Sequence, residues 1–109
     1  MKLSDAIRLG AMLKPQGRGC LEMNGHSCAL GAALDAIGHL GHQYGGQILR
    51  EHWPYLETEV CGPLRLMGRL YRVIVDLNDD HGWTREQIAD WVATVEPHVA
   101  QPETQAVTA

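Results

Sequence analysis

The chain contains the segment Leu77-Asn-Asp-Asp-His-Gly-Trp-Thr-Arg-Glu-Gln-Ile-Ala-Asp-Trp-Val92, which predicts a helix end, a polar turn and a new helix. Thr84 stands where an N-cap residue belongs, and Gln87 completes a capping box three residues later. Trp83 and Ile88 occupy the two positions of a hydrophobic staple. The new helix is expected to bury one face, because its apolar residues recur at helical spacing as Ile88, Trp91, Val92 and Val95.

Residues 63–77, just before this segment, predict the central helix of the fold. Pro63 suits the first turn of a helix, since the missing N–H is not needed there. Residues 57–62 are expected to form a loop ahead of it. The apolar row of this helix consists of Leu66, Leu70, Val73 and Leu77, widened by Met67 and Ile74.

The first forty residues predict two helices and a hairpin between them. Ser4 is placed to cap the first helix, which must end before Pro15 and has its apolar positions at Ile7, Leu9, Met12 and Leu13. Asn24-Gly25 is the strongest short signal for a hairpin, here within residues 20–28. A second helix is expected over 28–37, and its many small side chains allow neighbours to approach closely.

The remaining elements are a short helix over 47–53, which Pro54 ends, and the helix after Thr84, which is expected to end before Pro97. Residues 98–109 lack apolar periodicity and are predicted to be a disordered tail. We therefore expect one helical domain over 1–97. Its fold class is mainly α, with four to five helices packed around the helix at 63–77 and one small β-hairpin near 20–28.

Composition narrows the class of protein. A chain of 109 residues with 45% hydrophobic and 20% charged residues fits one soluble domain. No apolar run reaches the roughly 18 residues of a membrane span, so a cytoplasmic protein without membrane contact is expected. A net charge of −4 makes nucleic acid an unlikely partner. The three cysteines are an odd number, which favours free thiols over a disulfide framework.

Cys28 and His26 are the weak catalytic candidates. Cys28 falls in the first turn of a predicted helix, where the helix dipole stabilises a thiolate, and His26 lies two residues upstream. Cysteine hydrolases place their nucleophile in such a position. The alternative is a small buried side chain in an Ala- and Gly-rich surface, and under that interpretation the chain has no catalytic residue.

A metal site is the second chemical hypothesis. Zinc ligands usually occur as paired motifs of the CxxC or HxxxH type, and none occurs here. We therefore expect no bound metal and no cofactor. The weak candidate ligands are Cys20, His26, Cys28, Cys61 and His81.

Two sets of residues are candidates for binding. Trp53 and Tyr55 flank Pro54 in a connecting segment, where they form either an exposed interface or, through Trp53, the bottom of the core. The second set follows the predicted helix at i, i+4 and i+7, which makes it either a phosphate-binding stripe or a solvated face with acidic neighbours. Its members are Arg65, Arg69 and Arg72.

Two motifs carry a resemblance: Cys28-Ala-Leu-Gly-Ala-Ala33, and Leu77-Asn-Asp-x-His followed by Trp83-Thr-Arg-Glu-Gln-Ile-Ala-Asp-Trp-Val92. They resemble segments of small uncharacterised proteins of bacteria and phages, and the resemblance covers most of residues 1–96. It implies a shared fold without an assigned activity.

Some of those sequences also carry a Cys-x-x-Cys before the long helix and a histidine five residues ahead of the LNDxH histidine, which resembles a zinc site. Here Cys61 and His81 stand at two of those positions, while Leu64 and Asp76 occupy the others. The resemblance thus implies a metal site that is degraded in this chain or rebuilt with Cys20, His26 or Cys28.

These observations favour a small intracellular protein that binds another macromolecule, as an accessory protein of a phage, mobile element or bacterium. A protein partner is expected, and a homo-oligomer is a further option. The alternative function is a structural zinc-binding domain, and the third is a cysteine-dependent enzyme.

Overall fold

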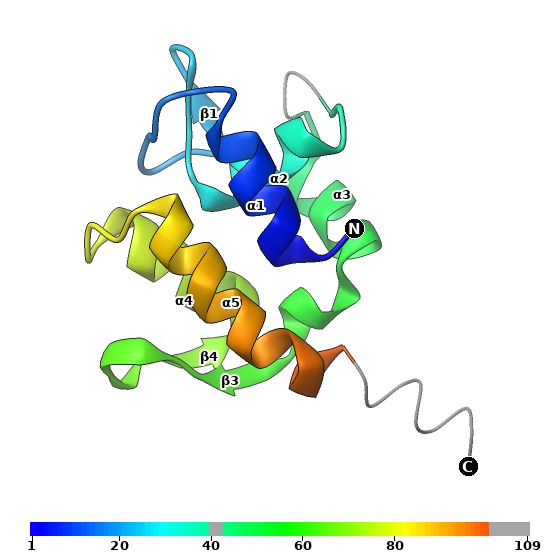
Figure 1. Ribbon diagram of the computed structural model, residues 1–109, viewed down its shortest axis with the longest axis vertical. Helices are drawn as coiled ribbons and strands as arrows, with labels where there is room; N and C mark the ends of the chain where they lie inside the picture. The colour runs from blue at the N-terminus through cyan, green and yellow to red at the C-terminus, as the bar shows by residue number, and fades with distance from the viewer. Residues whose placement is uncertain (40–42, 101–109) are drawn as a thin grey trace.

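The computed structural model describes residues 1–39 and 43–100, which form a mainly helical fold with two small antiparallel sheets (Figure 1). The prediction of a mainly α fold with a small hairpin is therefore confirmed. Within these residues no helix is long and apolar enough to cross a membrane. In chain order the elements are α1 (Leu3–Ala11), β1 (Glu22–Met23), β2 (His26–Ser27), α2 (Ala29–Ala36), α3 (Gly45–His52), the 3-10 helix η1 (Pro54–Glu57), β3 (Glu59–Cys61), the 3-10 helix η2 (Pro63–Arg65), β4 (Met67–Arg69), α4 (Leu70–Asp79) and α5 (Arg85–Val99).

The core lies between the helices, and α1 packs against both α2 and α5. Gly10 makes the α1–α2 contact close, because a Cβ at this position would stand 1.7 Å from the carbonyl oxygen of Ala32. The small side chains of α2 thus permit the close approach that their composition predicts. The largest fully buried side chains include Leu3, Ile7, Leu30, Leu34, Leu49, Leu56, Leu70, Ile74, Leu77 and Ile88.

The helix expected over 63–77 begins only at Leu70, so that prediction was wrong in its first half. Residues 59–69 instead form a second hairpin, in which β3 and β4 pair antiparallel with Cys61 opposite Met67. Pro63, which we interpreted as a helix start, opens the turn of this hairpin, and its carbonyl accepts a hydrogen bond from the Leu66 N–H at 3.0 Å. Proline is common both in the first turn of a helix and in tight turns, because its fixed φ suits each position and neither needs a backbone N–H.

The first helix buries a different face from the one expected. Ile7 is buried together with Leu3 and Gly10, whereas Leu9, Met12 and Leu13 are exposed. The helix does end before Pro15, as predicted. Ser4 is not its N-cap, which is Lys2; the buried Ser4 hydroxyl donates a hydrogen bond to the carboxylate of Glu96 in α5.

The last helix starts as predicted and ends later. Thr84 Oγ1 accepts a hydrogen bond from the Gln87 N–H at 3.1 Å, and Gln87 Oε1 accepts one from the Thr84 N–H at 2.9 Å, so the capping box is confirmed. The expected end before Pro97 was wrong, because α5 continues to Val99. The hydrogen bonds that Glu96 makes to α1 favour this continuation, since they fix the residue before the proline in the helix. Residues 101–109 of the predicted tail lie outside the described residues.

Three further sequence predictions agree with the structure. Asn24 and Gly25 have φ values of 54° and 79° and join β1 to β2, which confirms the hairpin near 20–28. Cys28 is the N-cap of α2, and Gly38 follows the end of that helix with φ of 80°. The short third helix ends at His52, two residues before Pro54.

The polar residues of the 77–92 segment hold distant parts of the chain together. Asn78 Oδ1 accepts hydrogen bonds from the Ala29 N–H at 3.1 Å and from Gln16 Nε2 at 2.9 Å. The buried guanidinium of Arg85 donates to Ser27 Oγ at 3.0 Å and to the Lys14 carbonyl at 2.7 Å. The motif therefore serves the architecture, because its side chains satisfy backbone groups of α2 and of the loop after α1.

Candidate functional sites

Cys28 is the N-cap residue of α2 and is buried there. Its side chain is 7% exposed, and its Sγ accepts a hydrogen bond from the Gly31 N–H at 3.4 Å. Burial raises the pKa of the Cys28 thiol, and this effect outweighs the N–H groups of α2 that lower it. Of the two interpretations of Cys28, burial therefore favours the small buried side chain over the thiolate. His26 is exposed on β2, and its Nδ1 lies 3.1 Å from the carbonyl oxygen of Asn24.

The candidate zinc ligands lie in different parts of the fold. Cys20 and Cys28 line one pocket beside α4. Cys61 is exposed on β3, and His81 is exposed in the loop after α4. Among the residues that the structure describes, no three His, Cys, Asp or Glu side chains are grouped so that they could hold a metal ion.

Trp53 belongs to the core, so of the two interpretations of this segment the one that places Trp53 in the core holds, and the exposed aromatic cluster does not form. Its ring is 2% exposed, and its Nε1 donates a hydrogen bond to the Met1 carbonyl at 3.0 Å. Tyr55 is partly buried, and its hydroxyl donates to Glu96 Oε2 at 2.5 Å and accepts from the Leu3 N–H at 3.2 Å. Burial and the bond to Glu96 raise the pKa of Tyr55. Both aromatic side chains thus tie the N-terminus to the body of the fold.

The three arginines do not form a stripe on one helix, because only Arg72 lies in α4. Arg69 is in β4 and pairs with Glu57 at 3.0 Å, while Arg72 pairs with Asp76 at 3.2 Å. Those two arginines fit the interpretation of a solvated face with acidic neighbours. Arg65 is exposed in the turn between β3 and β4, and it makes no ion pair with the residues that the structure describes.

The β3–β4 hairpin exposes apolar side chains that the sequence analysis assigned to a helix. It extends below the helices, and its turn lies at the lower left in Figure 1. Leu64 is 60% exposed, Met67 is 77% exposed, and Cys61, opposite Met67 in the ladder, is also exposed. Leu66 packs against the core instead. We call the exposed set Cys61, Leu64, Arg65 and Met67 the hairpin tip.

The turn of the hairpin tip adopts a conformation that its residues disfavour. Leu64 and Arg65, its two central residues, have φ values of 58° and 60°. Two positive φ angles are what a type I′ turn requires, and Asn-Gly is the usual sequence for it. The β1–β2 hairpin follows that rule with Asn24 and Gly25 at the same two positions. Leucine and arginine carry a Cβ, so each costs about 1–2 kcal/mol in this region.

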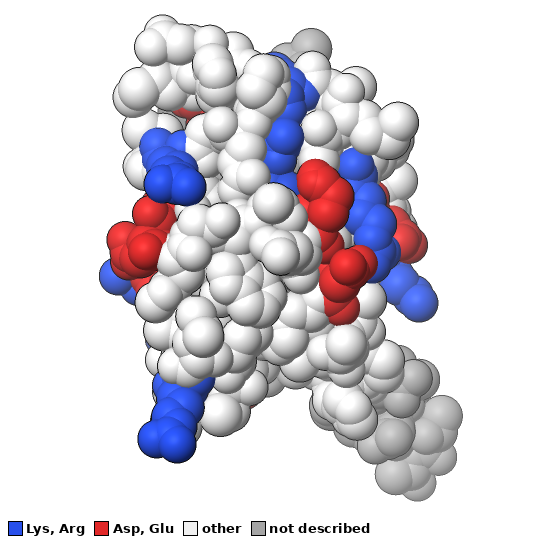
Figure 2. Space-filling model, turned by 60° about the vertical axis from the view of Figure 1, so that its left-hand side comes forward, with Lys and Arg blue, Asp and Glu red and all other residues white. Residues whose placement is uncertain are grey.

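Figure 2 brings forward the side of the molecule that lies at the left of Figure 1, which includes the hairpin turn. A broad area in the middle of this face carries neither basic nor acidic side chains, and charged groups stand around its edges. White in this view includes polar residues as well as apolar ones, so the exposed apolar groups are identified from Leu64 and Met67, which are 60% and 77% exposed.

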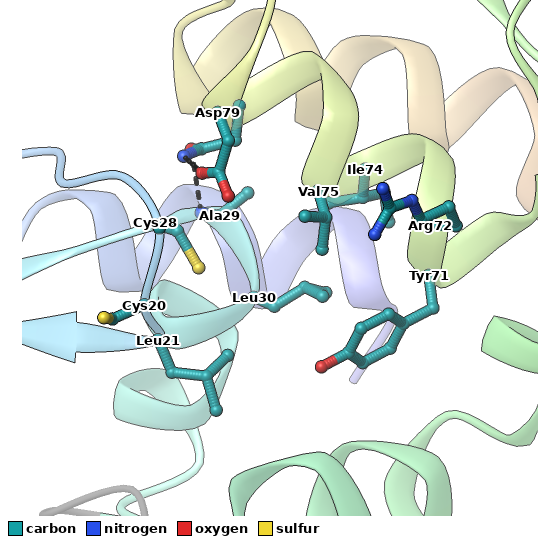
Figure 3. Close-up of a pocket in the computed structure, with 12 residues that line it drawn as sticks. Cys20, Leu21, Cys28, Ala29, Leu30, Tyr71, Arg72, Ile74, Val75 and Asp79 are labelled. Carbon is teal, nitrogen blue, oxygen red and sulfur yellow. Dashed lines mark hydrogen bonds between the residues drawn. The ribbon is translucent and has the colours of Figure 1, made fainter.

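A pocket of about 210 Å³ lies between the start of α2, one face of α4 and the loop before β1 (Figure 3). Its apolar lining includes Leu21, Leu30, Ile74 and Val75. In Figure 3 the Asp79 carboxylate points into this space from the end of α4, above Cys28. Sequence analysis missed the pocket because its two halves, residues 19–30 and 71–79, meet only through tertiary packing.

Compared with protein-family models, with curated proteins and with solved structures, the chain matches none of them.

Proposed function

We propose that this protein binds another protein through the hairpin tip, where Leu64 and Met67 act as apolar anchors and Arg65 as a charged one. The observation that carries the proposal is the Leu64–Arg65 turn. Its φ angles are those of a type I′ turn, yet both of its residues carry a Cβ, which makes positive φ unfavourable for them.

The internal comparison with the other hairpin supports a role for these side chains. Asn24-Gly25 makes a turn with the same signs of φ and little conformational strain, so the same chain contains a turn of this kind built from residues that favour it. Backbone strain that is kept in place of a cheaper alternative is typical of functional positions. At the tip the strain presents Leu64 to solvent and places Arg65 beside it.

The composition of the tip indicates the chemistry of the partner. Methionine adapts to irregular apolar surfaces, and exposed leucine and methionine side chains gain free energy when a partner covers them. Arginine is among the residues enriched at the energetic centres of interfaces. We infer a partner surface with an apolar depression and a carboxylate beside it, which would pair with Arg65.

Affinity capture with the full chain tests this proposal. Wild type, a Leu64→Ser/Met67→Ser variant and a control are immobilised and exposed to extracts of cells that naturally produce the protein. The control is Met12→Ser/Leu13→Ser, because these residues are similarly exposed but lie at the end of α1. Quantitative mass spectrometry then compares the recovered proteins.

The proposal predicts that one protein is recovered by wild type and control and is lost from the tip variant. Equal recovery of the same proteins by all three would contradict it. Recovery of only a second copy of this chain would also contradict it, since the occupant would then be the protein itself.

A further inference from the structure

The pocket beside α4 has the features of a small-molecule site, and it does not depend on the hairpin tip. Its floor consists of apolar side chains, among which Leu30 and Ile74 are fully buried. Leu21 and Val75 are partly buried around it. The polar groups at its upper side are the Cys28 thiol and the Asp79 carboxylate (Figure 3). Arg72 also lines the pocket, and its guanidinium is paired with Asp76 at 3.2 Å.

The N–H groups at the start of α2 are used internally, so this end of the pocket does not offer a site for an anion. The Ala29 N–H donates to Asn78 Oδ1 at 3.1 Å, and the Gly31 N–H donates to Cys28 Sγ at 3.4 Å. Helix N-termini bind anions through such N–H groups when they are left without partners. Here the fold itself has capped them.

Asp79, unlike these N–H groups, can still form hydrogen bonds with a ligand. Its Oδ1 accepts a hydrogen bond from Asn78 Nδ2 at 2.8 Å, and among the described residues no cationic side chain forms an ion pair with it. A carboxylate has about four lone-pair positions, so capacity remains for a donor inside the pocket. Its place at the end of α4 is also unfavourable for the helix dipole, which prefers cations there.

The geometry points to a ligand with an ammonium head and an apolar body. We propose that the pocket binds a small organic amine, whose ammonium donates to the Asp79 carboxylate while its body packs on Leu21, Leu30, Ile74 and Val75. The volume of about 210 Å³ is below that of pockets for drug-sized molecules, so the ligand is of the size of a benzyl or butyl amine.

Titration of the ¹⁵N-labelled full chain with benzylammonium tests the proposal by NMR. Benzyl alcohol and benzoate, which have similar shapes but are neutral and anionic, are titrated in parallel. We expect chemical-shift changes centred on the amides of residues 28–31 and 71–79, and an affinity order of benzylammonium, then benzyl alcohol, then benzoate. Benzoate binding best, or no saturable change near the pocket with benzylammonium, would overturn the proposal.

Two variants locate the recognition. Asp79→Asn keeps the shape and a polar side chain but removes the charge, and it should weaken benzylammonium at least about tenfold while leaving benzyl alcohol nearly unchanged. Asp80→Asn is the control, since Asp80 is exposed and does not line the pocket. Val75→Trp should fill the pocket and weaken both ligands. Unchanged benzylammonium affinity in folded Asp79→Asn would contradict the role of this carboxylate.

Discussion

The carboxylate of Glu96 accepts a hydrogen bond from the Leu3 N–H at 2.8 Å, so the end of the last helix caps the start of the first. The same buried carboxylate accepts hydrogen bonds from the Ser4 hydroxyl and from the Tyr55 hydroxyl. The bonds from the backbone N–H groups of Leu3 and Ser4 satisfy donors that every helix leaves open in its first turn. They also explain why α1 needs no capping side chain of its own.

Glu96→Ala should lower the free energy of unfolding by about 3 kcal/mol, because it leaves several buried donors without an acceptor. Chemical denaturation measures this change. Glu86→Ala is the matched control on the same helix, since Glu86 is exposed, and it should cost less than about 1 kcal/mol. Equal losses of stability in the two variants would show that the buried hydrogen bonds of Glu96 do not stabilise the fold.

Sequence reasoning found the elements whose signals are local. The capping box at Thr84 and the Asn24-Gly25 turn each depend on residues a few positions apart, and both appear in the structure. Glu96 could not be recognised as a cap, because its partners lie more than 90 residues away in the chain. The same reason hid the pocket between α2 and α4.

The β3–β4 hairpin was missed for a different reason. Its turn has the φ angles of an Asn-Gly turn but carries Leu64 and Arg65, so the residue signature was absent. Pro63 and the spacing of the leucines then favoured a helix. The hypothesis of a catalytic Cys28 also rested on a local signal, its position at the start of a predicted helix. The pKa of its thiol is instead raised mainly by burial, which is a property of the whole fold.

Asn78→Ala should also destabilise the protein by about 3 kcal/mol. Its side chain makes a buried hydrogen bond to the Ala29 N–H and a partly buried one to the Gly17 carbonyl, and both backbone groups would lose their partner. Thermal unfolding followed by circular dichroism measures the effect. Asp80→Ala, two residues on and exposed, should leave the melting temperature nearly unchanged. A stable Asn78→Ala protein would mean that the motif is kept for something other than architecture.

Cys28 should react much more slowly with iodoacetamide than Cys20, because alkylation requires an accessible thiolate. Burial raises the pKa of the Cys28 thiol, so at pH 8 a smaller fraction of it is ionised, and Cys20 is exposed. Peptide mass spectrometry over time should show a rate at least about tenfold lower for Cys28. Faster alkylation of Cys28 than of Cys20 would revive the hypothesis of a cysteine-dependent enzyme.

The purified protein should contain no stoichiometric zinc, because the described Cys and His side chains are not grouped around a common point. Elemental analysis of protein produced in zinc-supplemented medium checks this prediction. About one zinc per chain, lost in Cys61→Ser or His81→Ala, would contradict it and would favour the structural zinc-binding domain.

The central claim is that the side chains of Leu64 and Arg65 bind a protein partner and are not needed to form the turn of the hairpin tip. Replacing them together with Asn and Gly preserves the turn and removes both side chains. The reverse exchange in the other hairpin, Asn24→Leu/Gly25→Arg, controls for the effect of the turn on stability, and it should lower the melting temperature.

The most direct measurement combines thermal unfolding of the Leu64→Asn/Arg65→Gly protein with its capture of the partner that wild type recovers. We predict a gain of about 2 kcal/mol in stability, seen as a melting temperature roughly ten degrees higher, together with loss of capture. A protein that is no more stable, or that captures the partner as well as wild type does, would contradict the account.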